Sequence, residues 1–240
     1  MAFESDRRYM SRAQAEAADI DVGLRQYMLG VYNYMASGLA LTGIVALLVA
    51  SSPQATALLF GTPLKWVVML APLALVFFLG FRLDRMQVST ARGLFWVFSA
   101  LMGASLASIF LVYTGTSIAS TFFITATAFA GLSLYGYTTK RDLSAFGAFL
   151  VMGLWGLIIA MVVNMFLHST GLQFVVSAAG VLIFAGLTAW DTQKVKEMYW
   201  QADGFDVAAK KSVMGALVLY LDFINLFMFL LQFLGVQRRD

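Results

Sequence analysis

The stretch LYLDFINLFMFLLQFLG (residues 219–235) decides the fold class of this 240-residue chain. With the residues before it, it is long and apolar enough to cross the ~30 Å hydrocarbon core of a bilayer as a helix. It nevertheless carries an acid, Asp222. A charged side chain at the centre of a membrane costs about 2.5–3.5 kcal/mol on insertion scales, so Asp222 indicates a functional site whose partner has to be found.

A second acid, Asp191, lies at the inner end of the preceding apolar segment. The two acids meet only if the helix continues inward past Asp191, which Lys194 and Lys196 permit because lysine side chains can extend to the head groups. Two carboxyl groups in contact at low dielectric cannot easily both ionise, so they share a proton and titrate as a coupled pair. We interpret Asp191 and Asp222 as a proton switch. The protonated pair would join the helices, and the deprotonated pair would hold a passing Ca²⁺ weakly, because two carboxylates are too few for tight binding.

Composition extends this interpretation to the whole chain. It is 60% hydrophobic and 12% charged, whereas soluble proteins have roughly 25% charged residues. Without cysteine and with a single histidine, it excludes thiolate and imidazole-rich metal centres. We therefore predict an all-α integral membrane protein, a bundle of seven transmembrane helices, with no bound cofactor. The predicted spans are residues 27–50, 64–81, 93–113, 118–137, 144–167, 172–190 and 212–236.

The distribution of basic residues orients the bundle. Residues 1–26 are rich in charge and contain no apolar run, so they predict a cytosolic tail and not a signal peptide, with residues 27–240 as the membrane domain. With the N-terminus inside, thirteen of the sixteen Lys and Arg residues fall in inner segments, and Lys65, Arg238 and Arg239 lie outside. The positive-inside rule thus predicts a cytoplasmic N-terminus and a periplasmic C-terminus. It also explains the net charge without nucleic-acid binding.

Three residues of the predicted site allow more than one interpretation. Arg82 ends the second span on the same side as Asp191, so an arginine–carboxylate pair would latch the inner mouth. Arg82 also suits a plain positive-inside anchor. Asp191 alone fits an interfacial residue solvated from the cytosol. Asp222 alone fits a structural hydrogen bond between helices, for example to Asn33.

Three stretches resemble the Bax inhibitor family, whose bacterial members include YccA-like and YetJ-like proteins. They are GLSLYGYTTKRDLS (131–144), AWDTQKVK (189–196) and the segment 219–235. The resemblance implies seven helices around a central last helix, and a pH-sensitive calcium leak in the bacterial inner membrane. It places a di-aspartyl sensor on Asp191 and Asp222 and its latching arginine on Arg82. A further family carboxylate, expected near Ala71, has no counterpart in the local sequence LAPLA.

Other function classes fit the motifs less well. Intramembrane aspartyl proteases also pair aspartates on spans six and seven, but here no glycine lies within three residues before Asp222 and no proline follows Pro72. A rhomboid-like protease needs Gly-x-Ser-Gly and a histidine, and Ser133 lacks the second glycine while His168 lies on the outer side. We therefore expect no enzymatic activity. The alternative that stays open, also implied by YccA-like proteins, is a non-conducting regulatory partner of a membrane-bound AAA protease.

Overall fold

The computed structural model describes the backbone of residues 12–238 and the side chains of residues 22–238 apart from residue 84. Within this part the chain is helical except for short connections and an isolated antiparallel bridge between Tyr113 and Gln237. The helices are α1 (Arg12–Ala50), α2 (Pro53–Gly61), α3 (Leu64–Arg82), the 3₁₀ helix η2 (Leu83–Arg85), α4 (Val88–Leu106), α5 (Ile109–Val112), α6 (Gly115–Thr138), α7 (Ser144–Leu167), α8 (Thr170–Glu197) and α9 (Phe205–Leu234).

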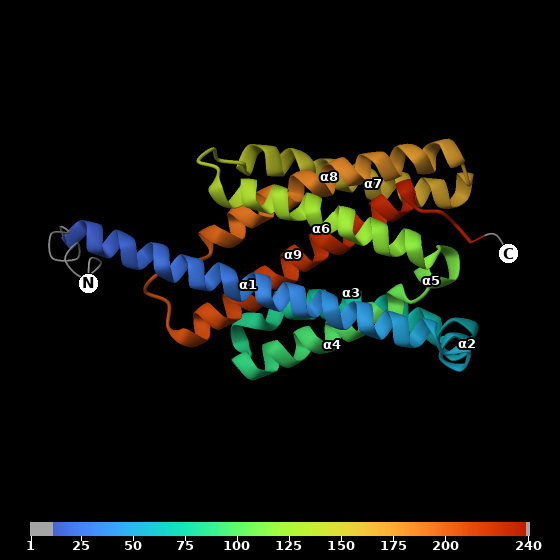
Figure 1. Cartoon of the computed structure of the whole chain (residues 1–240), viewed down its shortest axis with the longest axis horizontal. Coiled ribbons are helices and arrows are strands. Elements are labelled where there is room, and N and C mark those ends of the chain that lie inside the picture. The colour runs from blue at the N-terminus through green and yellow to red at the C-terminus, as the bar shows by residue number, and fades with distance from the viewer. Residues whose placement is uncertain (1–11, 239–240) are drawn as a thin grey trace.

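Seven spans in the described part are long and apolar enough to cross a membrane, which confirms the predicted all-α bundle. They are α1 from Val22 onward, α3, α4 with α5, α6, α7, α8 and α9. Successive spans run in opposite directions, so the start of α1 and the end of α9 lie at opposite ends of the molecule (Figure 1). This arrangement agrees with termini on two sides of a bilayer.

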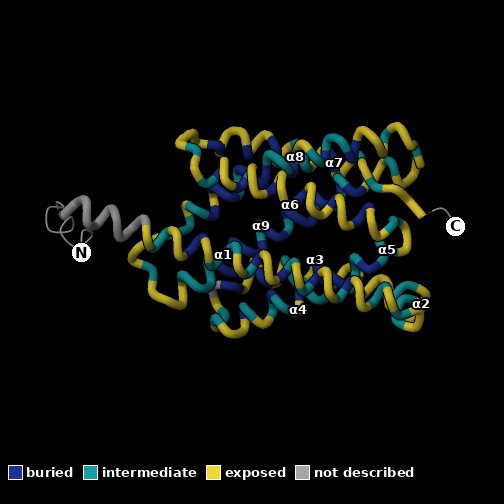
Figure 2. The backbone as a smooth tube through the Cα atoms, viewed as in Figure 1, coloured by how far each residue is buried: buried dark blue, intermediate teal, exposed yellow. Residues whose placement is uncertain are grey.

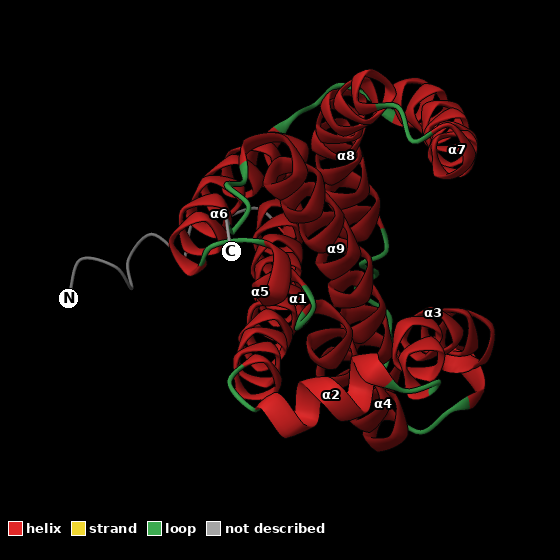
Figure 3. Cartoon of the chain, turned by 90° about the vertical axis from the view of Figure 1, so that its right-hand side faces the viewer, coloured by secondary structure: helices red, strands yellow, loops and turns green. Residues whose placement is uncertain are grey.

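Helix α9 occupies the centre of the bundle, as predicted. In its most apolar window 72% of the residues are buried, against 17–39% in the other six spans. The end-on view shows α9 surrounded by the other helices (Figure 3), and its backbone is mostly dark blue when coloured by burial (Figure 2). Asp222, the more deeply buried of the two acids, therefore lies on the most enclosed helix.

Two helix boundaries differ from the prediction in a way that matters for the acids. Helix α8 runs seven residues past residue 190, to Glu197, and α9 begins at Phe205, not at residue 212. Because these helix ends contain polar residues, the spans predicted from the sequence were too short. Helices can extend beyond the apolar layer, because their backbone groups stay hydrogen-bonded there as well.

Helix α2 was not predicted. It begins with a conventional start signal, since the Ser52 hydroxyl accepts a hydrogen bond from the backbone N–H of Ala55 and Pro53 occupies the first turn. It has no buried residue and connects α1 to α3 at the end of the bundle away from the N-terminus.

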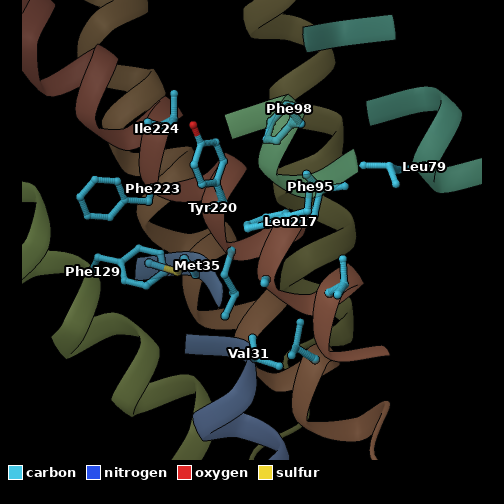
Figure 4. Packing of buried hydrophobic residues seen from close by; sticks show 14 of the residues in the cluster. Val31, Met35, Leu79, Phe95, Phe98, Phe129, Leu217, Tyr220, Phe223 and Ile224 are labelled. Atoms are coloured by element: carbon cyan, nitrogen blue, oxygen red, sulfur yellow. The ribbon is translucent and has the colours of Figure 1, made fainter. Parts of the chain in front are cut away.

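Aromatic side chains fill the contact between α9, α1 and α4. Tyr220 is fully buried, and its ring meets Phe98 and Phe95 edge to face at centroid distances of 5.2 and 6.3 Å (Figure 4). Its hydroxyl lies 2.6 Å from the Thr42 hydroxyl on α1. Edge-to-face pairs and a satisfied hydroxyl fix the rotation of α9 about its own axis, and thus the direction in which Asp222 points.

Helices α6 and α8 approach most closely at Gly136. A Cβ atom added there would overlap the backbone carbonyl of Ala189, two residues before Asp191. Gly131, five residues earlier on the same helix, has no neighbouring atom within 4 Å of its Cβ position. The two glycines therefore make a matched pair, one inside the helix contact and one outside it.

We expect Gly136→Ala to lower the free energy of unfolding by about 1–3 kcal/mol, the usual cost of overpacking a close contact. Gly131→Ala should leave it unchanged or raise it by about 0.5–1 kcal/mol, because glycine inside a helix is unfavourable. Thermal unfolding in detergent micelles measures both. Equal melting temperatures for the two variants would contradict the close approach of α6 and α8.

Candidate functional site

The structure brings Asp191 and Asp222 together. Asp191 lies on α8 six residues before the helix ends, and Asp222 lies in the middle of the adjacent α9. Their carboxyl groups lie close enough to interact directly. This contact exists because α8 continues past Asp191 to Glu197, which confirms the condition set by the sequence. Asn33, proposed as another partner for Asp222, is exposed on α1.

A hydrogen bond between two acids requires a proton. A carboxylate can only accept hydrogen bonds, so one of the two groups must be a carboxylic acid that donates. Asp222 is 5% exposed and Asp191 is half-buried. Among the described residues no donor reaches the second oxygen of Asp222, Oδ2, which is buried. The geometry therefore suits a pair of acids that shares one proton, and Oδ2 of Asp222 is enclosed in the interior.

A lysine on the same helix accompanies the pair. Lys194 lies about one turn beyond Asp191 and interacts electrostatically with its carboxylate. The Lys194 ammonium lies 4.3 Å from the centroid of the Trp190 ring, and that ring packs on Gly147 of α7, where an added Cβ would overlap it. The lysine is thereby held beside Asp191 while its ammonium stays at the surface.

Arg82 is not brought into the pair. It is exposed in the last turn of α3, and in the described part of the chain the cation that acts on Asp191 is Lys194. Its neighbour in sequence, Asp84, has a side chain outside the described set. The latch assigned to Arg82 therefore stays a prediction.

A chain of hydroxyl groups connects α1, α6 and α8 beside the pair. The Tyr32 and Ser133 hydroxyls lie 2.6 Å apart, and Ser133 lies 3.0 Å from the hydroxyl of Thr192, the residue after Asp191. Thr192 in turn donates to the carbonyl of Thr188. The spacing of these residues in the sequence does not predict these contacts. Hydroxyl-bearing side chains in apolar spans usually face other helices, but their partners lie on helices far apart in sequence.

The C-terminal end of α8 is pinned to the loop between α6 and α7. Buried Gln193 accepts a hydrogen bond from the backbone N–H of Leu143 and donates to the carbonyl of Arg141, each at 2.8 Å. Lys196 donates to the carbonyl of Tyr137 at 2.9 Å. These bonds hold the end of α8 in place immediately after Asp191.

We expect Gln193→Leu to speed amide hydrogen exchange at Leu143 by at least about fivefold. The leucine leaves that N–H without its acceptor, and an unsatisfied buried group costs about 1–3 kcal/mol, which is roughly a five- to 150-fold change in the opening equilibrium. The exposed Gln201 in the α8–α9 connection provides the control, Gln201→Leu. Unchanged exchange at Leu143 would show that Gln193 does not hold this loop.

The acids available for a metal ion are few. No group of three or more His, Cys, Asp or Glu side chains close enough to hold a metal ion occurs in the described residues. Ca²⁺ takes six to eight oxygen ligands, so Asp191 and Asp222 would supply a minority of them and water the rest. The donor set suits a hydrated cation in transit better than a stored one.

Comparison with known proteins gives a family for this arrangement. The family model described as "Inhibitor of apoptosis-promoting Bax1" matches residues 24–239. The match covers all seven spans, except that the first span begins two residues earlier, at Val22. Both aspartates and Arg82 lie inside the matched region.

Several bacterial proteins are similar over nearly their whole length. The protein RP147 of Rickettsia prowazekii is 54% identical, covering 92% of this chain and 93% of its own. A Caulobacter vibrioides protein is 48% identical over 97% and 98% of the two chains. The inner membrane protein YbhL of Escherichia coli is 48% identical over 90% of this chain and 94% of its own.

Proposed function

The chain belongs to the Bax inhibitor family of multi-pass membrane proteins, and from this premise we propose that it acts in the bacterial inner membrane as a pH-sensitive leak for calcium, gated by Asp191 and Asp222. The observation that carries the proposal is the direct contact between these two carboxyl groups inside the bundle. The N-terminus faces the cytosol in this proposal, as the basic residues predict.

The proton decides whether the pair attracts or repels. With one proton present, the pair joins α8 to α9 by a hydrogen bond to a charged group, worth about 1.5–3 kcal/mol. Without it, two like charges about 4 Å apart repel by about 4 kcal/mol at an effective dielectric constant of about 20. The total change of roughly 5–7 kcal/mol is comparable with the ~5.5 kcal/mol needed to move a two-state equilibrium from 1:99 to 99:1.

A divalent cation relieves the repulsion that loss of the shared proton creates. Both carboxylates then offer oxygens, including Oδ2 of Asp222, which has no donor among the described residues. Ca²⁺ prefers such hard oxygen ligands. Because the site provides only two carboxylates, the ion is bound weakly enough to leave. The proposed sequence is therefore deprotonation, separation of α8 from α9, and passage of a hydrated cation.

We expect calcium flux into proteoliposomes to be low at about pH 6 and higher at about pH 8, since alkaline buffer removes the shared proton. Asp222→Asn should abolish this pH dependence, because the amide cannot lose its proton and keeps the two helices joined. The measurement uses a calcium-sensitive dye inside the vesicles. Asp206→Asn, which removes an exposed acid from the first turn of the same helix, is the control and should behave like the native chain.

Two results would count against the proposal. If Asp222→Asn retains the native rise of flux with pH, the pair is not the gate. If folded native protein gives no flux above empty liposomes at either pH, the leak itself is wrong, and the alternative of a non-conducting partner of a membrane-bound AAA protease gains weight.

A further inference from the structure

A furrow runs between α1 and α6 along the outside of the bundle. Its first part has a volume of about 540 Å³ and is lined by α1 from Arg25 to Ala36 and by α6 from Phe129 to Tyr137. Its second part, about 490 Å³, continues along α1 from Leu39 and is formed almost entirely by apolar side chains. Both helices pack on α9, which separates them (Figure 1). The furrow is therefore a feature of the bundle architecture.

The dimensions of the first part match one leaflet of a bilayer. Eleven residues separate Arg25 from Ala36, or about 16 Å along a helix. Half of a ~30 Å hydrocarbon core is about 15 Å. The lining includes Leu29 and Leu134, which are 51% and 62% exposed and face whatever fills the furrow. A hydrocarbon chain is the occupant that such a surface accepts inside a membrane.

The charge of the furrow is confined to its mouth. Arg25 is exposed, and it lies three residues after Val22, where the apolar span begins. This position corresponds to the depth of the lipid head groups. Across the mouth lies Tyr137, and the Lys196 ammonium is 5.4 Å from the centroid of its ring. Arg25 forms no ion pair with any residue whose side chain the structure describes. One cation at the mouth, Arg25, with Lys196 behind Tyr137, and apolar walls beyond them complement a phosphate attached to an acyl chain.

The floor of the furrow is linked to Thr192, the residue that follows Asp191 in sequence. Tyr32 and Ser133 line the first part and join α1 to α6 through their hydroxyls, and Ser133 continues to Thr192, next to Asp191. Met35 and Phe129, both buried, complete the floor (Figure 4). Whatever occupies the furrow thus contacts the side chains that connect α1 to the inner part of α8.

We propose that this furrow between α1 and α6 binds one anionic phospholipid from the leaflet at the N-terminal end of the bundle, with the phosphate at Arg25 and an acyl chain over Tyr32 and Ser133. The binding does not depend on ion conduction. It places a lipid in contact with the hydroxyl chain that leads to α8, so the site is distinct from the acid pair but adjacent to it.

The test is a titration of the delipidated full-length protein in detergent with phosphatidylglycerol or phosphatidylcholine of identical acyl chains, followed by native mass spectrometry. We expect one molecule of phosphatidylglycerol to bind more tightly than the further lipid molecules that associate with the protein. Arg25→Gln should reduce the preference for phosphatidylglycerol roughly fivefold, the effect of one cation at the membrane surface. Arg85→Gln, an exposed arginine of η2 outside the furrow, is the matched control and should keep the preference.

A second variant tests the position of the acyl chain. Ala130→Trp fills the furrow from an exposed position on α6, and it should remove the tight lipid. Ala148→Trp puts the same ring on an exposed position of α7 and should not. Equal melting temperatures of the two variants establish that both are folded.

Four results would overturn the site. They are equal affinity of the native chain for both lipids, equal weakening by Arg25→Gln and Arg85→Gln, native binding by Ala130→Trp, and displacement of the lipid by inorganic phosphate alone. The last would identify an anion site without a chain. None of these results depends on calcium flux, so the lipid site and the leak are tested separately.

Discussion

An acid inside the hydrocarbon layer has to find a partner, and this requirement organises the bundle. Asp222 lies on the most buried helix, α9, and its partner is another acid, Asp191, on α8. The pair can form only because α8 extends beyond its apolar part and because Gln193 and Lys196 fasten that extension to the neighbouring loop. Around it, Tyr220 fixes the rotation of α9 against α1 and α4.

The distribution of unsatisfied polar atoms also points to the pair. Buried side-chain polar atoms almost always have a hydrogen-bond partner. In the described part of the chain the exceptions are Oδ2 of Asp222, Nε1 of Trp190 and Nε of Arg92. The first belongs to the pair and the second to the residue before Asp191. Arg92 has an aromatic neighbour instead, since its guanidinium lies 5.8 Å from the Tyr34 ring centroid.

The sequence predicted the class of fold and the number of spans, because apolar length and intramembrane acids are strong local signals. The central position of the last helix was implied by the resemblance to the Bax inhibitor family. The sequence also identified Asp191 and Asp222, although their contact depended on a helix extension that it left open. It missed α2, the early start of α9 and the hydroxyl chain through Ser133. Those features depend on capping, on polar helix ends and on contacts between distant segments, which hydropathy does not encode.

The central position of α9 has a consequence for how the protein is made. Domains acquire structure from the N-terminal side during synthesis, but here the helix that fills the core follows the other six spans in chain order. Until it enters the bilayer, Phe95 and Phe98 have no Tyr220 to pack against, and Asp191 has no acid beside it. Insertion of the first six spans and assembly of the core are thus separate events in time. During the interval the vacant centre has to be shielded by lipid or by the insertion machinery, and the nascent chain is most exposed to quality-control proteases.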